Sequence, residues 1–497
     1  MNYSMIRYIL AWVLTFIGGF LLLPAIVSGI YQEGEGFAFV AVAIVCLILG
    51  VVGRIKKPKN KVFYSKEGFV SVSLSWILLS LIGALPFWLT GEIPSYIDAV
   101  FETISGFTTT GSSILTDVEA LSYTALFWRS FTHWVGGMGV LVFIMAILPL
   151  SGSSNMHLMR AESPGPTVGK MVPKVKRTAM ILYGIYLGIT VAGVIALLLA
   201  GMNLFESLTL TFGAVGTGGF GILNSSCASY SVSVQIIITV LMLICSINFS
   251  IYFLILVRKP KEAFLNDELR FFLLLVFGSA LMITFNIQDG FGNFFEAFQT
   301  AIFQVASIIS TSGFATADFN LWPAFSQTIL VLLMLVGACA GSTGGGFKIS
   351  RLLILLKSVK NEIRAIIHPR SVQKVYSNGR SVGDEVVKRV LVYLAAYAMI
   401  MLASILIVSL DGKDMTTNVT AVIATFNNIG PGLNMVGPVG NFSEFGLLSK
   451  LVLMAGMLIG RLEIFPMLVL LVPGTWKIAL RLPEREKKDG KGKNRRV

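Results

Sequence analysis

The segment Tyr96–Ser113, YIDAVFETISGFTTTGSS, is a short amphipathic stretch followed by a turn rich in Gly, Thr and Ser. Its first part, Tyr96–Phe107, is too short to cross the ~30 Å hydrocarbon core of a bilayer as a helix. Long apolar runs flank the segment, at about Val70–Leu89 and Leu126–Leu150. This order predicts a spanning helix, a half-helix that enters the membrane and returns, a turn at Thr108–Ser113 and a second spanning helix.

The same order recurs three more times along the chain. In each later repeat the four ranges are given in the order first run, short stretch, turn and second run. The second repeat has Ala179–Ala200, Leu204–Val215, Gly216–Phe220 and Val232–Val257, and the third has Phe271–Phe285, Phe294–Ile309, Ser310–Phe314 and Ala324–Leu356. The fourth has Val387–Leu410, Met415–Phe426, Asn427–Gly432 and Leu447–Ile478. The turn glycines Gly111, Gly218, Gly313 and Gly430 recur about every 100 residues, which indicates an internal repeat.

Two further apolar runs, about Ile6–Ile30 and Phe37–Val52, precede the repeats. Non-helical backbone is tolerated at membrane depth only when it is buried in protein or lines a water-filled cavity, so four such turns need a shared cavity. We therefore predict an all-α polytopic membrane protein with two N-terminal spans and four helix–re-entrant pore loop–helix repeats around a pseudo-four-fold pore. The expected boundaries are 1–62 for the two N-terminal transmembrane helices, 63–158, 159–262 and 263–365 for pore repeats 1 to 3, with a broken inner helix in the third, 366–482 for a cytosolic hairpin and repeat 4, and 483–497 for a basic cytosolic tail.

Composition excludes a soluble domain. Hydrophobic residues make up 55% of the chain and charged residues 13%, whereas soluble domains have roughly 25% charged residues. The net charge of +13 does not indicate nucleic-acid binding, because most Lys and Arg lie in the N-terminus, in loops on one side of the predicted spans and in the C-terminal tail. The intervening loops carry mostly acidic residues. This asymmetry follows the positive-inside rule and predicts that both termini are cytoplasmic.

No group of residues suggests catalysis, and we expect no enzyme activity. The four cysteines and three histidines form no disulfide, metal-ligand or nucleophile pattern, and His133 is expected to be a packed helix residue. Gly216–Gly221 fits a dinucleotide fingerprint but lies between membrane segments. Gly341–Gly346 lacks the Gly-Lys-Ser/Thr of a phosphate-binding loop, and we interpret it as a break in a helix. No directly bound cofactor is expected.

The four turns are suited to a monovalent cation. A re-entrant helix that enters from outside directs its partially negative C-terminal end toward the membrane centre. The glycine turn that follows can direct backbone carbonyls inward to replace the hydration shell of an ion. An Asp or Glu ring at these turns would have indicated divalent cations, and the turns contain neither residue.

The turns contain the motifs Thr108-Thr-Thr-Gly111, Thr217-Gly-Gly-Phe220, Thr311-Ser-Gly-Phe314 and Asn428-Ile-Gly-Pro-Gly432. These motifs resemble the four filter segments of the Trk/Ktr/HKT superfamily of potassium transporters. The resemblance covers essentially the whole chain and includes Trp134-Val-Gly-Gly-Met-Gly139, Gly337-Ala-Cys-Ala-Gly-Ser-Thr-Gly-Gly-Gly346 and Gly460-Arg-Leu-Glu463. The two N-terminal spans are similar to those of the bacterial Trk type, the potassium uptake transmembrane subunits TrkH and TrkG.

The resemblance implies potassium uptake across the bacterial inner membrane. It implies a homodimer in which each protomer has its own pore, gated by a cytosolic ring of nucleotide-binding regulatory subunits, TrkA-like or KtrA-like, with nucleotide bound only by that partner. Glycine in the first turn, Gly111, is typical of potassium-selective members. The residues expected at the filter, where K+ would bind, are Thr109, Thr110, Gly111, Thr217, Gly218, Ser312, Gly313, Asn428, Ile429 and Gly430.

Arg461 lies within the last apolar run, where a charge is costly unless it faces a cavity or a partner. The resemblance implies that Arg461 faces the pore below the filter, beside an intramembrane loop that closes it; the alternative is a packing arginine neutralised by loop carbonyls. The implied gate residues are Gly341, Ser342, Thr343, Gly344, Gly345, Gly346 and Arg461. Glu463 is not an obvious partner of Arg461, and Lys348 is expected to extend to the cytosolic surface.

Two functions remain open: a gated channel-like pore, and a secondary transporter that couples potassium to protons or sodium, including a sodium-dependent Ktr-type subunit. Coupled transporters usually carry buried Asp or Glu within their spans, and this sequence has few. Asn378-Gly379 predicts a short cytosolic hairpin. The hairpin and the basic tail, Glu484–Val497, form a candidate docking surface, although the tail could equally be a disordered segment held at the lipid surface.

Overall fold

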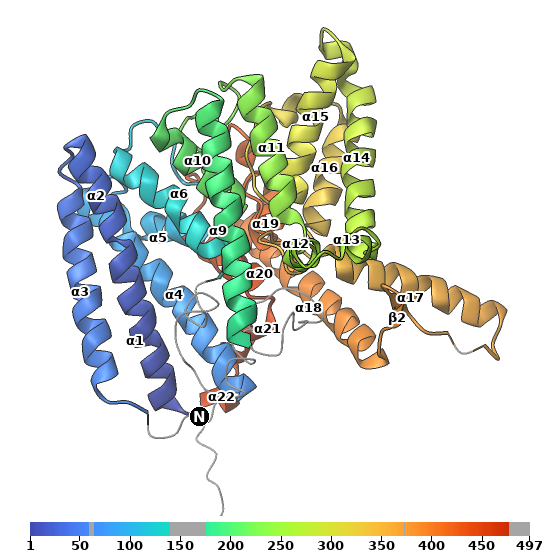
Figure 1. The fold of residues 1–497 in the computed structure, drawn as a ribbon, viewed down its shortest axis with the longest axis horizontal. Coiled ribbons are helices and arrows are strands. Elements are labelled where there is room, and N and C mark those ends of the chain that lie inside the picture. The colour runs from blue at the N-terminus through green and yellow to red at the C-terminus, as the bar shows by residue number, and fades with distance from the viewer. Residues whose placement is uncertain (59–63, 140–174, 372, 477–497) are drawn as a thin grey trace, which may run out of the picture.

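The protein is almost entirely helical in its computed structural model, which describes residues 1–58, 64–139, 175–371 and 373–476. The two predicted N-terminal spans are present: α1 (Tyr3–Phe20) continues into α2 (Leu22–Tyr31) as one span, and α3 (Gly36–Ile55) is the second. They lie together at one side of the molecule (Figure 1).

Four repeats follow, each with an outer helix, a short helix and an inner helix. The outer helices are α4 (Ser65–Thr90), α9 (Val175–Leu199), α14 (Asp267–Ile287) and α18 (Asp384–Val408). The short helices are α5 (Tyr96–Phe107), α10 (Leu204–Gly216), α15 (Phe294–Ile309) and α19 (Met415–Phe426). The inner helices begin as α6 (Tyr123–Gly137), α11 (Val232–Ser246), α16 (Ala324–Val336) and α20 (Leu447–Arg461). The predicted short stretches agree with these helices to within one residue.

The repeats close into a ring. Each outer helix packs against the short helix of its own repeat, and each inner helix packs against the short helix of the next. The pairs between repeats are α6 with α10, α11 with α15, α16 with α19, and α20 with α5, so the fourth repeat returns to the first. This closure confirms the predicted pseudo-four-fold architecture.

Each short helix begins at a capping side chain, which satisfies a backbone N–H that has no partner within the helix. Asn203 accepts from the Glu206 N–H at 2.8 Å, and Asn293 accepts from the Glu296 N–H at 2.9 Å. Ser95 and Asp414 occupy the same position in the first and fourth repeats. The sequence therefore sets where each half-helix starts, at the outer end of the repeat.

Three inner helices are broken, and two of these breaks differ from the sequence prediction. The break between α16 and α17 (Ile349–Ile367) falls in the predicted glycine segment. In the second repeat the predicted single run is wrong, because α12 (Phe249–Leu256) bends by 91° from α11. The last run is also not one helix: it divides into α20, α21 (Phe465–Leu471) and α22 (Pro473–Trp476). In the first repeat α6 ends at Gly137, and residues 140–150 of the predicted run lie outside the described residues.

The remaining elements are short. They are α13 (Pro260–Phe264), the 3-10 turns η1 (Gln288–Gly290), η2 (Phe319–Leu321), η3 (Ser409–Asp411) and η4 (Asn434–Val436), and the strands β1 (Tyr376–Ser377) and β2 (Arg380–Ser381). The strands pair antiparallel, which confirms the predicted hairpin. This hairpin follows α17, which projects from the body of the protein (Figure 1). The basic tail lies outside the described residues.

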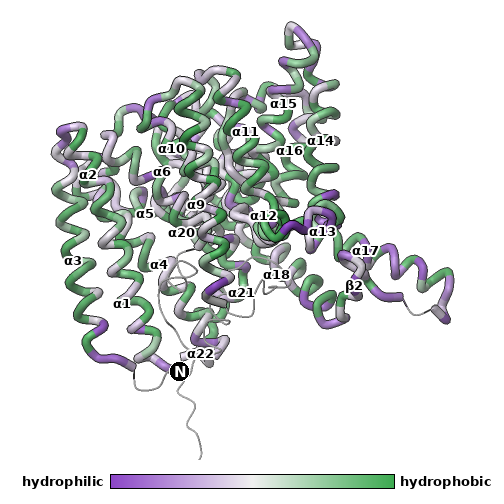
Figure 2. Tube along the Cα trace, in the orientation of Figure 1, coloured by the Kyte–Doolittle hydropathy of each residue, from purple (hydrophilic) through white to green (hydrophobic). Residues whose placement is uncertain are grey.

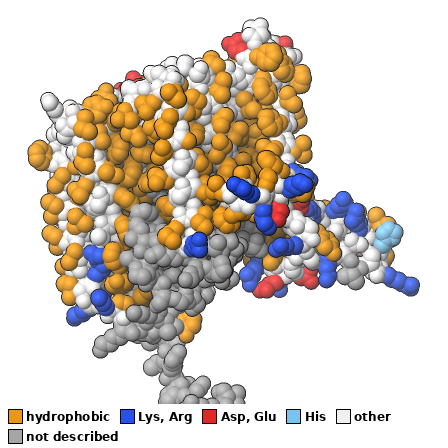
Figure 3. Space-filling model, viewed as in Figure 1, with side chains coloured by type: hydrophobic (Ala, Val, Ile, Leu, Met, Phe, Trp, Pro, Cys, Tyr) orange, Lys and Arg blue, Asp and Glu red, His pale blue; other side chains and the backbone are white. Residues whose placement is uncertain are grey.

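The surface agrees with a membrane location. Six helices in the described part of the chain are long and apolar enough to span a bilayer, or seven if the bent pair α11 and α12 is counted as one span. Hydrophobic residues dominate the helices and polar residues the connections (Figure 2). Figure 3 shows hydrophobic side chains over most of one face, with Lys and Arg gathered at one edge and on the projecting α17.

The caps predict a local stability effect. Replacing Asn293 by Ala removes the cap of α15 and should destabilise the protein by ~1 kcal/mol, whereas Asn293→Asp keeps a capping oxygen and should not. Thermal unfolding of both variants in detergent measures the difference. Equal melting temperatures for the two variants would contradict this role of Asn293.

Candidate functional site

The four predicted turns share one backbone conformation. In each turn, one of the first two residues after the short helix has a left-handed φ. These residues are Thr109 (54°), Thr217 (55°), Thr311 (61°) and Asn428 (56°). Two residues later a glycine has φ between 80° and 100°, in the order Gly111, Gly219, Gly313 and Gly430. Such values are uncommon for residues with a Cβ and ordinary for glycine.

The second turn corrects the predicted register. The turn glycine predicted from the sequence is Gly218, but the residue that occupies the left-handed position is Gly219. Two residues at equivalent positions, Gly219 and Thr311, were therefore missing from the predicted site. Aligning Thr217-Gly-Gly-Phe220 with Thr311-Ser-Gly-Phe314 by their phenylalanines would have found both.

The same hydrogen bond sets this register in all four turns. The middle residue of each turn donates its N–H to a carbonyl five residues earlier, at the end of the short helix. These bonds are Thr110 to Ser105 (2.8 Å), Gly218 to Gly213 (2.8 Å), Ser312 to Ser307 (2.9 Å) and Ile429 to Ala424 (3.0 Å). Each turn thus continues directly from the C-terminal end of its helix, where the helix dipole is negative.

The turns contact one another in a closed ring. A Cβ added to Gly111 would overlap the carbonyl oxygen of Gly218, and one added to Gly219 would overlap that of Ser312. In the same way, a Cβ on Gly313 would overlap the Ile429 carbonyl oxygen. A Cβ on Gly430 would crowd the Thr110 carbonyl oxygen, and this contact closes the ring. The four carbonyls that belong to the middle residues therefore lie next to the glycine of the preceding repeat, where a Cβ would overlap three of them and crowd the fourth.

All four turn glycines, Gly111, Gly219, Gly313 and Gly430, line one cavity of about 150 Å³. Its other walls come from the segments that follow the turns, including Asn224. The Asn224 side chain donates to Asp117 at 2.8 Å, and this hydrogen bond lowers the pKa of that carboxyl. Asp117 lies between Thr116 and Val118, two residues that line the cavity.

A buried ion pair supports the first two turns from behind. Arg129 donates to Glu102 at 2.9 Å, and the two side chains are 2% and 0% exposed. Glu102 also accepts from the Ile114 N–H, while Arg129 donates to the Gly221 carbonyl and lies over the Phe220 ring. The pair therefore links the backbone after the first turn to the backbone after the second.

His133 is a packed helix residue, as predicted, and it also links two repeats. Its Nδ1 is 2.7 Å from the Gly106 carbonyl, and its Nε2 accepts from the Phe220 N–H at 3.2 Å. This pattern assigns the proton to Nδ1. Among the described residues no group of three or more His, Cys, Asp or Glu side chains is placed to hold a metal ion.

The intramembrane loop, residues 337–348, lies against the inner side of the turns. The Gly345 N–H donates to the Thr311 hydroxyl at 2.6 Å. A Cβ on Gly344 would crowd the Ser310 carbonyl, and one on Gly345 would overlap the Asn427 carbonyl. The Thr343 N–H and hydroxyl both donate to the Cys245 carbonyl, at the end of α11. The glycines allow the loop to approach the third and fourth turns this closely.

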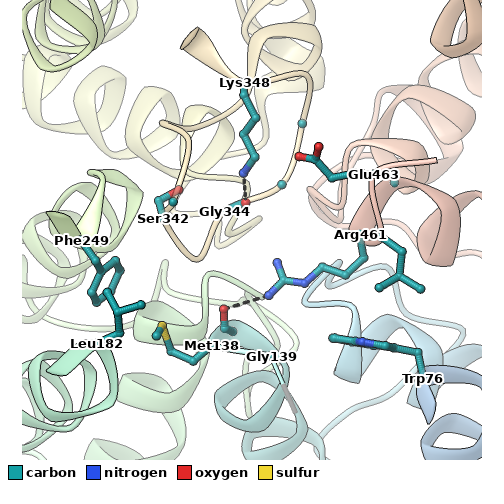
Figure 4. A pocket seen from close by; sticks show the side chains of 16 residues that line it. Trp76, Met138, Gly139, Leu182, Phe249, Ser342, Gly344, Lys348, Arg461 and Glu463 are labelled. Atoms are coloured by element: carbon teal, nitrogen blue, oxygen red, sulfur yellow. Dashed lines mark hydrogen bonds between the residues drawn. The ribbon is translucent and has the colours of Figure 1, made fainter. Parts of the chain in front are cut away.

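Arg461 is the last residue of α20, so its predicted place within a continuous helix is wrong. Its guanidinium donates to the Thr343 carbonyl at 2.7 Å, and to the Gly136 and Gly137 carbonyls at 2.5 and 2.9 Å. It thereby bridges the loop of the third repeat and the end of α6 in the first. Arg461 and the loop line a common cavity of about 60 Å³ (Figure 4).

Lys348 does not extend to the cytosolic surface, which corrects another prediction. It is 2% exposed and donates to the Gly344 carbonyl within the loop. Glu463, which lies beside Lys348 and Arg461 in Figure 4, forms an ion pair with Arg351, a partner that the sequence did not indicate. The cavity wall therefore combines two basic groups, Lys348 and Arg461, with the acidic Glu463.

The four turns thus form a ring of backbone carbonyls with a cavity on each side. The intramembrane loop and Arg461 lie on its inner side. A family model described as cation transport protein, TrkH, matches residues 35–477. The chain belongs to the TrkH family. Members of this family are cation transport proteins, and the resemblance to the Trk type, predicted from the turn motifs, is confirmed.

Individual TrkH family members match over almost their whole length. The Trk system potassium uptake protein TrkH of Salmonella typhimurium is 36% identical over 491 residues, 96% of this chain and 100% of that protein. TrkG of Escherichia coli K12 is 32% identical over 467 residues, 91% and 94% of the two chains. The crystal structure of the potassium transporter TrkH from Vibrio parahaemolyticus has a TM-score of 0.86 at 33% identity, with 96% of this chain and 100% of that chain covered.

The corrected register gives a direct test. Gly219→Ala places a Cβ against the Ser312 carbonyl at a left-handed φ, and we expect it to abolish ion flux through the purified protein in liposomes. Gly221→Ala is the matched control, because a Cβ there meets no atom closer than 3.5 Å. Flux that survives Gly219→Ala would contradict the placement of this glycine in the ring.

Proposed function

We propose that the protein takes up potassium through a gated, channel-like pore in the bacterial inner membrane. The relatives named above are potassium uptake proteins or a potassium transporter, and the chain covers nearly all of each. The ions pass through the ring of turns, where the expected filter residues and the two added ones, Gly219 and Thr311, surround the path.

The observation that carries this proposal is the closed ring of four backbone carbonyls, from Thr110, Gly218, Ser312 and Ile429. Carbonyl oxygens without net charge can replace the hydration water of K+ and still release the ion. Four helix C-terminal ends add a negative potential at the same place. No carboxylate belongs to the turns, which favours a monovalent over a divalent cation.

The gate in this proposal is the intramembrane loop with Arg461. The loop holds its place through the Gly345–Thr311 bond, and Arg461 holds the Thr343 carbonyl. A guanidinium on the inner side of the ring repels cations in the path. Opening therefore requires that the loop and Arg461 separate from the turns.

Coupled transport is the second candidate. Three glutamates at the spans or short helices are buried in the described residues: Glu67, Glu102 and Glu268. Glu102 is paired with Arg129, and Glu268 accepts from the Ala340 N–H at 2.7 Å. Both carboxylates are held in place by hydrogen bonds. This arrangement suits a structural role better than proton exchange. A sodium-dependent Ktr-type mechanism is tested by the same experiment as proton coupling.

We further propose the assembly that the family resemblance implies. Two copies form a homodimer with a pore in each, both termini are cytoplasmic, and a TrkA-like or KtrA-like ring binds nucleotide and controls the gate. The chain itself holds no cofactor and catalyses no reaction. The basic edge in Figure 3, including the projecting α17, is the face available to such a partner.

Rubidium uptake by purified protein in liposomes tests the function. We expect uptake to follow the potassium gradient alone and to continue when proton and sodium gradients are collapsed. Uptake that stops without one of those gradients would establish the coupled alternative instead.

Neutralising the gate arginine should open the pore. Arg461→Gln removes the guanidinium charge and weakens its bonds to Thr343 and α6, so we expect basal rubidium uptake to rise severalfold in the absence of the soluble partner. Lys413→Gln, which removes a half-buried cation paired with the exposed Glu444, is the control and should leave uptake unchanged. A rate for Arg461→Gln equal to that of the unmodified protein would reject Arg461 as part of the gate.

A further inference from the structure

Arg351 is a buried cation at the base of α17, directly after the intramembrane loop, and it is 4% exposed. Its guanidinium forms an ion pair with Glu463, donates to the Phe347 carbonyl at 3.0 Å and lies 3.9 Å from the centre of the Tyr393 ring. Burying a guanidinium is costly unless its charge is paired. The position of Arg351 therefore depends on Glu463.

Glu463 lies where the backbone is strained. Glu463 and Ile464 both have left-handed φ values, 58° and 66°, which for a β-branched residue such as isoleucine is an outlier. Strain of this kind persists only where surrounding contacts impose it. Ile464 is fully buried in a cluster with Phe347 and Tyr393, and the Arg351 pair holds the neighbouring Glu463 side chain.

Arg461, two residues before Glu463, ends α20 and borders the same short break. The two side chains hold the loop at two places. Arg461 binds the Thr343 carbonyl in the middle of the loop, and Glu463 binds Arg351 just after its end. The break between α20 and α21 therefore fixes the loop relative to the inner side of the turns, and a shift of α17 would be transmitted through Arg351 to both contacts.

We propose that the Arg351–Glu463 ion pair is a latch that holds the pore closed by positioning Arg461 and the intramembrane loop. The inference rests on the proposed potassium pore and adds how α17 controls it. Movement of α17, the helix that projects on the basic side, breaks or shifts the pair. The strained break then relaxes, and Arg461 leaves the Thr343 carbonyl.

An ion pair suits this task better than an apolar contact. Buried ion pairs contribute little net stability compared with hydrophobic residues of the same size, because desolvation offsets most of the attraction. Their separation is correspondingly easy once water can reach both charges. Glu463 lines the inner cavity, so water entering on opening would reach its carboxylate first.

The test uses the full-length protein in liposomes without a soluble partner. Glu463→Gln and the double variant R351Q/E463Q, which removes both charges without adding an apolar contact, should both raise basal rubidium uptake roughly tenfold, the change that a loss of 1.4 kcal/mol from the closed state produces. The double variant matters because it leaves no unpaired buried charge and should fold even if the single variants do not. Arg351→Lys, which keeps the charge, should retain most of the low basal rate. Competition between rubidium and sodium should be unchanged in every variant, since the turns are not altered.

A second readout does not depend on transport. Cys339 lies in the loop and is fully buried, so its labelling by a small thiol reagent, mapped by mass spectrometry, reports loop displacement. Labelling of Cys339 should rise in the latch variants, while that of the equally buried Cys227, outside the loop, should not. Asp98→Asn breaks the Lys450–Asp98 pair, which also joins the fourth repeat to the first, and should change neither readout.

A folded double variant with the uptake and the Cys339 labelling of the unmodified protein would overturn the latch. Raised labelling without ion flux in any variant, including the unmodified protein, would support the latch and reject the potassium pore. Raised uptake together with altered rubidium and sodium competition would show general disruption of the turns and would also overturn the proposal.

Discussion

The structure depends on one constraint: backbone polar groups that leave a helix inside a membrane must find partners within the protein. Four half-helices end at membrane depth, and each would leave several carbonyls without intrahelical partners. The four turns meet this requirement in part through the repeated bond back to the helix end, as from Thr110 to Ser105. The carbonyls that remain line a ring, where a desolvated cation can take the place of an N–H donor.

The broken inner helices meet the same requirement in another way. Cys245 and Ser246, at the end of α11, receive hydrogen bonds from Thr343 and Cys339 of the intramembrane loop. The last carbonyls of α6 receive bonds from Arg461. The loop and the arginine thus satisfy helix ends that belong to other repeats. Because the proposed gate also supplies these bonds, opening it must provide other partners for those carbonyls, and water in a widened cavity can do so.

The repeats are equivalent in backbone but not in side chains. Asn428 stands where the other turns have threonine, and its amide donates to the Thr110 hydroxyl and the Met457 carbonyl. The side-chain contacts between repeats also differ, since the Glu102–Arg129 pair and His133 join the first two repeats. The third and fourth repeats carry the loop and Arg461. The ring is formed by all four repeats, whereas the proposed gate belongs mainly to two of them.

The amino-acid sequence alone determined the architecture. Apolar length distinguishes half-helices from spans, capping residues set where the half-helices begin, and glycine marks the turns, so each of these features follows from local chemistry. The break at residues 337–348 was visible for the same reason, as a cluster of glycines. The turn motifs also sufficed to indicate the family.

Only the tertiary structure decided the register of the second turn, the breaks after Ser246 and Arg461, and the partners of the buried charges. Neighbouring glycines at 218 and 219 are locally interchangeable, and contact with the Ser312 carbonyl selects between them. The breaks occur within long runs that are mainly apolar, and contacts with other repeats, such as the bond from the Cys339 N–H to the Ser246 carbonyl, stabilise the bent form. Lys348, Arg351 and Glu463 meet partners from distant parts of the chain, and a charge in a sequence does not reveal which distant carbonyl or carboxylate the fold will bring beside it.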